Sequence, residues 1–316
     1  MSNTEHEIVI TGINGFVGEH LARQLKNTGH TVHGVGREQK PKETVAHLLD
    51  KYTQCDLMDR KATRSLSVHN TSAIIHLAGL ASVADSFKFP DRYKKDNSTM
   101  TDNLLSSAKE QGFTGRTVVI STGAIYDPNQ SMPLKEDALK TQGSPYSAGK
   151  IAAEETAKTY KGKGLDIVIA RPFNHIGPGQ ASGFLVSDLY DQILGTKDSR
   201  NSVISVGNIN TRRDFTDVRD IVKAYGLLAD APSLQYDTYN ISSGNSYSGK
   251  DILDQLSKEM RIAVTAEIDP ARVRPTDAPE IVGDSTRIRE ELHWSPSISL
   301  EQTISDFVTW KRDSVS

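Results

Sequence analysis

Tyr146 and Lys150 are the side chains in this sequence best suited to moving a proton. They lie four residues apart in a segment with a helical pattern, so both occupy one face of the helix. A phenol titrates at about pH 10, and a neighbouring ammonium group favours the phenolate. Thr122 adds a hydroxyl at the end of a predicted strand, at the edge where open α/β sheets bind ligands. The spacing also fits a capping turn with a surface Tyr/Lys pair.

Three glycines, Gly12, Gly15 and Gly18, form a turn between a predicted strand and a predicted helix. Small residues let the backbone approach a pyrophosphate, and the helix N-terminus supplies free N–H groups and partial positive charge. The spacing is GxxGxxG rather than the common GxGxxG. We interpret this turn as a dinucleotide-binding site, with an ordinary tight turn as the alternative.

The end of the second predicted strand favours one cofactor over another. An acidic residue there would accept hydrogen bonds from the adenosine ribose and repel a 2′-phosphate. This sequence has Gly36 and Arg37 instead, and a guanidinium group binds phosphate well. We therefore expect NADP(H), with NAD(H) possible. A solvated surface arginine is the alternative.

The elements that must position these residues alternate between strand and helix along the first half of the chain. Such alternation predicts a doubly wound parallel sheet, the Rossmann fold of the α/β class. The predicted strands are Glu7–Thr11, Thr31–Val35, Tyr52–Cys55, Ala73–Ala78, Thr117–Ser121 and Leu165–Ala170. The predicted helices are Phe16–Thr28, Thr99–Gln111 and Pro145–Lys161.

After Pro172 the regular alternation of strands and helices gives way to loop-rich segments, which predicts a smaller C-terminal substrate-binding lobe. Residues 173–180 and 198–210 are rich in loop-forming residues. We expect residues 1–172 to form the dinucleotide-binding domain, with 206–242 contributing to it. The lobe would comprise 173–205 and 243–316.

Composition excludes several functional classes. The chain has 316 residues and a net charge of −3, so it lacks the excess positive charge expected of a nucleic-acid-binding protein. The single cysteine, Cys55, rules out an intrachain disulfide, and the nine histidines show no metal-ligand spacing. The N-terminus has no secretory signal pattern, and no apolar run is long enough to span a bilayer. These features predict a cytoplasmic protein with no metal, nucleic-acid or membrane partner.

Taken together, the motifs resemble those of the extended short-chain dehydrogenase/reductase family that acts on nucleotide sugars. The final motifs look most similar to the GDP-4-keto-6-deoxy-D-mannose reductases, which form GDP-D-rhamnose. The segments that carry the resemblance are TGINGFVG (11–18), HLAG (76–79), TDNLL (101–105), STGAIY (121–126), YSAGK (146–150), RPFNHIGPGQ (171–180), RRDFTDVRD (212–220) and RP (274–275).

The resemblance implies a role for each matching residue. The catalytic residues would be Thr122, Tyr146 and Lys150. The cofactor-binding residues would be Gly12, Asn14, Gly15, Phe16, Val17, Gly18, Arg37, Asp56, Leu57, Leu77, Ala78, Gly79, Asn97, Tyr146, Lys150 and His175, with Asp56 and Leu57 beside the adenine and His175 near the nicotinamide. The sugar nucleotide would contact Ser82, Thr122, Asn174, Arg213 and Arg274.

Two departures within STGAIY narrow the implied chemistry. The related 4,6-dehydratases carry Asp-Glu directly after the threonine, whereas this chain has Gly123 and Ala124. The GDP-fucose synthase type has a cysteine at the position of Ala124. Dehydration and ring epimerisation are therefore disfavoured, which leaves reduction at a single carbon.

We expect NADPH-dependent reduction of the C4 ketone of an NDP-4-keto-6-deoxy-hexose, with a GDP sugar as first choice and a dTDP sugar as second. One alternative is an NDP-sugar 4-epimerase with tightly bound NAD. Another is a non-catalytic, NAD(P)-binding regulator, although the presence of Tyr146 and Lys150 argues against it. The resemblance also implies a homodimer.

Overall fold

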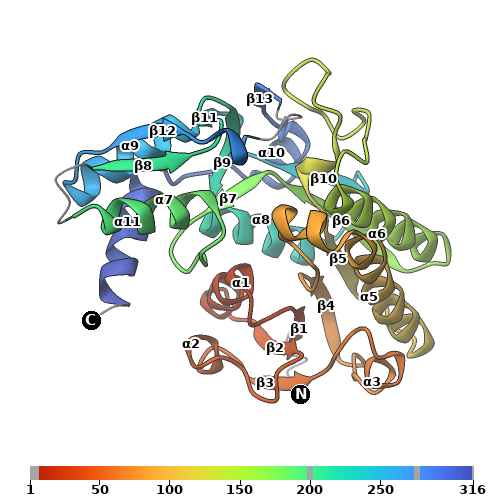
Figure 1. Ribbon diagram of the computed structural model, residues 1–316. Helices are drawn as coiled ribbons and strands as arrows, with labels where there is room; N and C mark the ends of the chain where they lie inside the picture. The colour runs from red at the N-terminus through yellow and green to blue at the C-terminus, as the bar shows by residue number, and fades with distance from the viewer. Residues whose placement is uncertain (1–6, 198–201, 274–277, 315–316) are drawn as a thin grey trace.

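The centre of the molecule is a seven-stranded sheet in which every neighbouring pair of strands is parallel (Figure 1). The computed structural model describes residues 7–197, 202–273 and 278–314. The strand order is β3-β2-β1-β4-β5-β6-β10, which confirms the predicted doubly wound fold. The strands are β1 Glu7–Thr11, β2 Thr31–Gly36, β3 Lys51–Gln54, β4 Thr71–His76, β5 Arg116–Ile120, β6 Asp166–Pro172 and β10 Thr238–Ile241.

The strands are apolar because both faces of the sheet are covered. In β1, Ile8 and Ile10 pack into one core, while Val9 packs into the core on the opposite face. Helices α1 and α8 lie together on one side of the sheet, and α5 and α6 lie side by side on the other (Figure 1). The helices of this half are α1 Phe16–Asn27, α2 Glu43–Ala46, α3 Arg60–Arg64, α4 Val83–Lys88, α5 Pro90–Glu110, α6 Pro145–Gly162 and α8 Val218–Asp230.

One predicted helix is much longer than expected. Helix α5 begins at Pro90 rather than at Thr99. Proline is well tolerated in the first helical turn, because its missing N–H would have no partner there. The added turns carry Tyr93 and Asn97, both buried beside the candidate site.

The remaining elements form a smaller unit with its own apolar core. Two segments expected to be loops each contain a strand: β7 within 173–180 and β8 within 198–210. Both are short strands stabilised by pairing with distant partners, β9 and β12, which local composition does not reveal. The strands are β7 Asn174–Ile176, β8 Val203–Val206, β9 Arg212–Asp217, β11 Ser246–Ser248, β12 Thr265–Ile268 and β13 Glu280–Ile281. The helices are α7 Leu185–Gly195, α9 Gly249–Met260 and α11 Leu300–Asp313. Helix α10, Thr286–Leu292, instead packs its buried Ile288 into the core of the sheet, beside β10 and α8.

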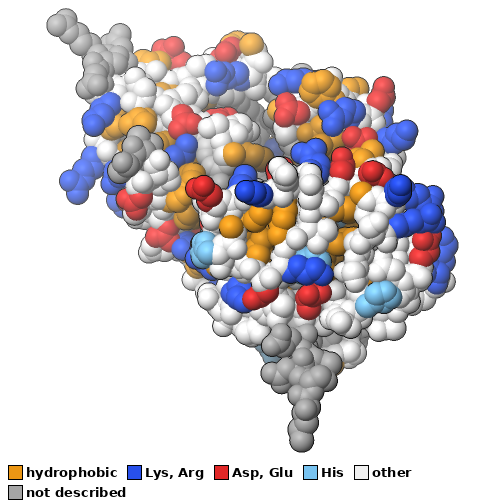
Figure 2. Space-filling view, turned by 90° about the horizontal axis from the view of Figure 1, so that it is seen from below, with side chains coloured by type: hydrophobic (Ala, Val, Ile, Leu, Met, Phe, Trp, Pro, Cys, Tyr) orange, Lys and Arg blue, Asp and Glu red, His pale blue; other side chains and the backbone are white. Residues whose placement is uncertain are grey.

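The surface mixes charges of both signs. On the face shown in Figure 2, lysine, arginine, aspartate and glutamate side chains are interspersed around hydrophobic ones. Across residues 7–197, 202–273 and 278–314, none of the helices is long and apolar enough to cross a membrane. The same residues hold no group of three or more His, Cys, Asp or Glu side chains arranged for a metal ion.

Candidate active site

The turn after β1 requires glycine at two of its three glycine positions. Gly12 has φ of +73°, and a Cβ added there would lie 2.8 Å from the backbone nitrogen of Ala78. A Cβ on Gly18 would lie 2.3 Å from the carbonyl oxygen of Ile13. The glycines thus let the turn approach the end of β4 and let α1 pack closely against the turn.

The N-terminus of α1 presents free donors beside this turn. Its N-cap residue is Gly15, which has no side chain to satisfy the N–H groups of the first turn. The first turn of α1, which includes Phe16 and Val17, therefore offers backbone N–H donors and the positive end of the helix dipole to an anion. These features fit the pyrophosphate of a dinucleotide.

A chain of hydrogen bonds joins the ends of β1 and β4 to α5. The Ala78 N–H donates to the Thr11 hydroxyl (3.2 Å), which lies 2.8 Å from Nδ1 of His76. Nε2 of His76 lies 3.2 Å from the Thr101 hydroxyl, which donates to the Asn97 carbonyl. Burial lowers the pKa of His76 to about 3, so this histidine is neutral. Because the Thr101 hydroxyl already donates to Asn97, it accepts from His76, so the His76 proton is on Nε2. Nδ1 of His76 then accepts the hydrogen bond from the Thr11 hydroxyl.

Asn97 positions the turn that follows β4. Its side-chain oxygen accepts from the Leu80 N–H (2.7 Å), and its amide donates to the Leu80 carbonyl (3.3 Å). A Cβ on Gly79 would lie 3.2 Å from the Asn97 side-chain oxygen and 3.4 Å from Nζ of Lys150. The turn 77–80, with Leu77, Ala78 and Gly79, is thereby fixed beside the predicted catalytic lysine.

The structure brings Thr122, Tyr146 and Lys150 to the same edge of the sheet. Thr122 follows β5, and its side chain is near enough to the Tyr146 hydroxyl to lower the pKa of that phenol. Tyr146 lies in the first turn of α6, where Ser144 caps the helix by accepting from the Ser147 N–H. One turn further on, Nζ of Lys150 donates to the Ile120 carbonyl at 2.8 Å.

Burial shifts the two titratable groups in ways the sequence analysis did not fully anticipate. Burial raises the pKa of Tyr146, against the lowering effect of the Thr122 hydrogen bond. The sequence analysis expected Lys150 to lower the pKa of Tyr146, and in the structure that pKa is raised instead. Burial also lowers the pKa of Lys150 to about 8, opposed by the Glu154 carboxylate. At neutral pH the phenol is protonated and the amine is mostly charged.

Gly149, which the sequence analysis did not single out, sets the spacing of α5 and α6. A Cβ on Gly149 would lie 1.9 Å from the carbonyl oxygen of Tyr93. The backbones of α5 and α6 are therefore in direct contact at Gly149, which lies between Tyr146 and Lys150. A glycine inside a strongly helical segment is the signal that could have identified this contact.

A buried ion pair anchors the next turn of α6. Arg171 donates to both carboxylate oxygens of Glu154 at 2.8 Å each and to the Tyr126 hydroxyl at 2.7 Å. Nζ of Lys140 donates to the same carboxylate at 2.6 Å. Arg171 and Lys140 hold the pKa of Glu154 down to about 2 despite its burial, so the carboxylate stays charged one turn beyond Lys150.

The end of β2 carries an acidic residue that the sequence analysis missed. Arg37 is exposed, and its role toward a cofactor phosphate stays a prediction. The next residue, Glu38, turns back so that its carboxylate accepts from the Asn14 side chain at 2.7 Å. Gly36 is the feature of the sequence that could have pointed to Glu38, because a glycine at the strand end leaves space for the side chain of a nearby residue.

The residues expected at the adenine have different surroundings. Asp56 is exposed, and its carboxylate accepts from the Met58 N–H at 2.9 Å. Leu57 is buried in the core beneath β1 and β2, and its carbonyl accepts from the Asn103 side chain. Their roles toward a cofactor remain predictions.

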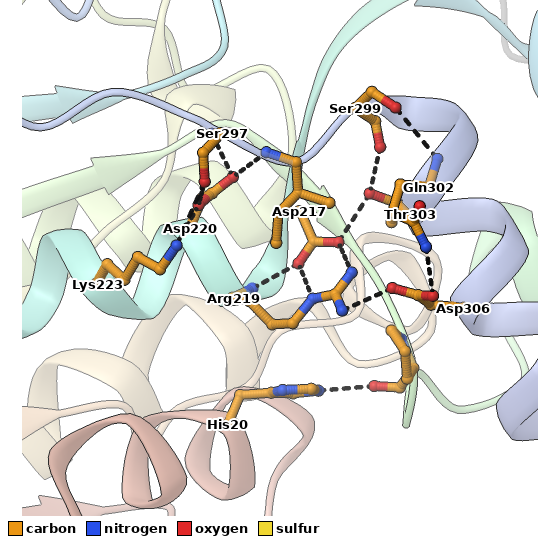
Figure 3. Close-up of polar contacts among 12 residues, drawn as sticks. His20, Asp217, Arg219, Asp220, Lys223, Ser297, Ser299, Gln302, Thr303 and Asp306 are labelled. Carbon is orange, nitrogen blue, oxygen red and sulfur yellow. Dashed lines mark hydrogen bonds and ion pairs between the residues drawn. The ribbon is translucent and has the colours of Figure 1, made fainter. Parts of the chain in front are cut away.

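Loop 173–180 lies over the first turns of α1. The ring of His175 stacks on Phe16, with centroids 6.2 Å apart, and its Nδ1 lies 3.1 Å from the Phe173 carbonyl. His20 of α1 bonds the Pro178 carbonyl at 2.7 Å (Figure 3). These contacts put His175 beside the glycine-rich turn, and its predicted place near a nicotinamide stays a prediction.

The residues expected to bind substrate come from three elements. Ser82 caps α4 by accepting from the Asp85 N–H, and it lies near enough to Tyr93 to affect the pKa of that phenol. Asn174 is exposed on β7, which pairs with β9, the strand that carries Arg213. The Arg213 side chain donates to the Arg212 and Ala278 carbonyls. Arg274 lies outside the described residues.

The three aspartates of RRDFTDVRD act as hydrogen-bond hubs. Asp214 accepts from the backbone of Ser243 and Gly244. Asp217 caps α8 and accepts from the Thr303 hydroxyl of α11, as Figure 3 shows. Asp220 accepts from the backbone N–H of Ser297 (2.8 Å), also in Figure 3. This motif therefore holds the C-terminal segments against β9 and α8.

Comparisons with known proteins place this chain among enzymes that act on nucleotide sugars. The family model described as GDP-mannose 4,6 dehydratase matches residues 9–307. GDP-6-deoxy-D-mannose reductase of Pseudomonas aeruginosa is 30% identical over 301 residues, covering 94% of each chain.

Two solved structures are similar over nearly their whole length. RMD from Pseudomonas aeruginosa, solved with NADPH, has a TM-score of 0.84 and 27% identity, covering 98% of this chain and 99% of that one. UDP-glucose 4-epimerase from Thermotoga maritima, solved with UDP-glucose, has a TM-score of 0.88 and 25% identity, covering 98% of this chain and 100% of that one. The similar proteins thus include a reductase and an epimerase.

Proposed function

The chain belongs to the GDP-mannose 4,6-dehydratase family of extended short-chain dehydrogenases/reductases, NAD(P)-dependent enzymes that modify nucleotide sugars, and from this we propose a specific reaction. It reduces the C4 ketone of an NDP-4-keto-6-deoxy-hexose with NADPH. GDP-4-keto-6-deoxy-D-mannose is the first choice of substrate, giving GDP-D-rhamnose, and a dTDP sugar is the second.

The observation that carries the proposal is the Thr122–Tyr146 contact followed by two residues without ionisable groups. Gly123 and Ala124 come directly after Thr122, and the Ala124 N–H donates to the Thr122 hydroxyl at 3.2 Å. Eliminating water from a sugar needs an acid and a base besides the tyrosine. With neither at these positions, the site suits proton delivery to a single oxygen.

Each catalytic side chain has a role that fits its environment. The phenol of Tyr146, kept protonated by its raised pKa, donates a proton to the oxygen at C4. Thr122 hydrogen-bonds that same oxygen as negative charge develops on it. The Lys150 ammonium binds the cofactor's ribose hydroxyls and stabilises the phenolate left after proton transfer.

The residues at the proposed cofactor site suit both the pyrophosphate and the 2′-phosphate of NADP(H). The bare turn at Gly12–Gly18 and the uncapped N-terminus of α1 suit the pyrophosphate, and exposed Arg37 suits a 2′-phosphate. When bound, NADPH supplies the hydride. NAD(H) is also possible, since similar structures include one solved with NADPH and others solved with NAD.

The sugar nucleotide would bind between the catalytic edge of the sheet and the C-terminal lobe. Ser82 and Asn174 offer hydrogen bonds there, and Arg213 and Arg274 supply charge for the diphosphate.

A homodimer through α5 and α6 is part of the proposal. The proposal rests on the resemblance to the family, since of the small residues on α6 Ala153 and Ala157 are buried within the chain and only Ala152 is partly exposed. Light scattering of the purified protein would test it, and a mass of one chain would contradict it.

The reaction is tested by incubating the protein with NADPH and GDP-4-keto-6-deoxy-D-mannose. We expect NADPH oxidation, and we expect Tyr146→Phe to slow it by at least about 100-fold because the proton donor is lost. Tyr160→Phe, a tyrosine at the far end of the same helix, is the matched control and should keep the activity. No oxidation with any 4-keto sugar nucleotide would contradict the reductase proposal.

A 4-epimerase is the second candidate, favoured by the similarity to UDP-glucose 4-epimerase. Protein that purifies with bound NAD and interconverts UDP-glucose and UDP-galactose without added cofactor would support it instead.

A further inference from the structure

The backbone directly after Thr122 packs against the ring of Phe173. A Cβ on Gly123 would lie 2.9 Å from three ring carbons of Phe173, so any side chain at that position would clash with the ring. Phe173 follows β6, whereas Gly123 follows β5, and both residues are buried. The missing ionisable group after Thr122 is therefore a requirement of the packing at this point.

Several segments hold the Phe173 ring in place. A Cβ on Gly283 would lie 2.6 Å from Cζ of Phe173, so a second glycine lies against the same ring. The ring stacks on Tyr126 with centroids 6.1 Å apart, and buried Leu134 completes this small apolar cluster. The Phe173 N–H donates to the Ile241 carbonyl at 2.9 Å, which ties the backbone to β10. The ring thus has neighbours on every segment that meets it and little space to move.

The turn that carries Thr122 depends on this ring. The short 3₁₀ helix Gly123–Ile125 begins after Thr122, whose hydroxyl accepts from the Ala124 N–H at 3.2 Å. The Ser147 hydroxyl donates to the Ala124 carbonyl at 2.8 Å, which ties the turn to α6. The Phe173 ring restrains the same turn from the segment after β6. Contacts from two elements therefore set the place of the Thr122 hydroxyl.

We propose that Phe173 is a positioning residue for Thr122. Its ring, packed against Gly123, holds the turn so that the Thr122 hydroxyl meets the oxygen at C4 beside Tyr146. Phe173 is only 5% exposed and has no polar group, so it acts through Thr122 rather than on the substrate. This inference rests on the proposed function, in which Thr122 stabilises the charge that develops on that oxygen.

The test is a double-mutant cycle on kcat with Thr122→Val, which removes the hydroxyl and keeps the branched shape. We expect Phe173→Leu to lower kcat by about 10-fold when Thr122 is present, because a small displacement of a catalytic group slows the reaction. In the Thr122→Val background, the same change should lower kcat by less than about twofold, since the hydroxyl that the ring positions is already gone. The dissociation constant of NADPH should stay near the wild-type value in both backgrounds.

Phe113→Leu is the matched control. Phe113 is 7% exposed and packs against Gly115 just before β5, at the end of that strand opposite Thr122. The two Phe→Leu variants should lose similar stability in urea unfolding, and Phe113→Leu should keep the wild-type kcat. Rates are expressed per NADPH-binding site, so a loss of folded protein does not lower them. Phe173→Met, with an unbranched and adaptable side chain, takes the place of Phe173→Leu if that variant does not fold.

The inference is overturned if Phe173→Leu leaves kcat unchanged, if it lowers kcat equally with and without the Thr122 hydroxyl, or if Phe113→Leu lowers kcat as much. Failure of the reductase proposal gives a different result. The chain would then interconvert UDP-glucose and UDP-galactose, and the cycle measured on that reaction would still show the dependence on Thr122. A wild-type chain that turns over neither kind of sugar nucleotide would contradict both.

Discussion

At the scale of single residues, burial sets the protonation states that the candidate chemistry needs. Tyr146 and Lys150 are both buried, and burial disfavours the charged form of each. The pKa of the phenol rises and that of the amine falls to about 8. Reduction of a ketone needs a protonated tyrosine, so the raised pKa suits proton delivery in this direction.

The pH dependence of reduction follows from these shifts. Lys150 is charged below its pKa and neutral above it, so kcat/KM should fall as the pH rises through about 8. Initial rates measured between about pH 6 and pH 10 check this, because Tyr146 loses its proton only at higher pH. A profile that stays flat through about pH 9.5 would show that the charge on Lys150 is not required.

At the scale of elements, the α5–α6 contact determines where the catalytic pair lies. Gly149 meets the Tyr93 carbonyl directly, and the Glu154–Arg171 ion pair fixes the next turn of α6 to the sheet. Two separate contacts thus restrain the helix on either side of Lys150.

Replacing Gly149 should separate these helices. Gly149→Ala puts a methyl group within 1.9 Å of the Tyr93 carbonyl oxygen, so the backbone of α5 or α6 must move. We expect a stability loss of about 1–3 kcal/mol in urea unfolding. We expect activity to fall by about 100-fold, since displacement of the catalytic side chains by about 1 Å has that effect.

Gly162→Ala provides the control for this substitution. Gly162 ends the same helix, and a Cβ there would meet no atom within 4 Å. Its replacement should leave activity unchanged and raise stability by up to about 1 kcal/mol. Equal effects of the two substitutions would contradict the packing argument.

At the scale of the whole molecule, the chain has two large apolar cores that are separate from each other. The sheet and its helices bury one set of apolar side chains, and β8, α7, α9 and α11 bury another. His20 joins loop 173–180 to α1, and Arg219 bridges Asp217 to Asp306 of α11 at 2.6 Å (Figure 3). The hubs of RRDFTDVRD therefore hold the two parts together.

Damage to the second core should affect substrate binding more than cofactor binding. Phe307 is fully buried in that core, so Phe307→Ala should cost about 3–5 kcal/mol of stability in urea unfolding. We expect KM for the sugar nucleotide to rise while the dissociation constant of NADPH stays near the wild-type value. Thr309→Ala, an exposed neighbour on α11, should change neither, and an equal loss of both ligands in Phe307→Ala would contradict the separation of the cores.

The amino-acid sequence determined the alternation of strand and helix in the Rossmann half and the approximate bounds of six of its seven strands, whereas β10 and the strand order appeared only in the structure. The apolar runs at 7–11, 73–78 and 117–121 are local signals, because strands covered on both faces must be apolar throughout. The glycine turn at 12–18 and the Tyr146–Lys150 spacing are local as well. Each could be interpreted without knowing what packs against it.

Tertiary structure alone decided the contacts between residues far apart in the chain. The approach of Gly149 to Tyr93, the Asn14–Glu38 hydrogen bond and the partners of Asp214, Asp217 and Asp220 all join separate elements. Burial of Tyr146 is likewise a property of the packed molecule, and it reversed the expected direction of the pKa shift. Local spacing specifies the face of a helix on which a side chain lies, whereas the packing of distant segments determines what that side chain meets and how much water reaches it.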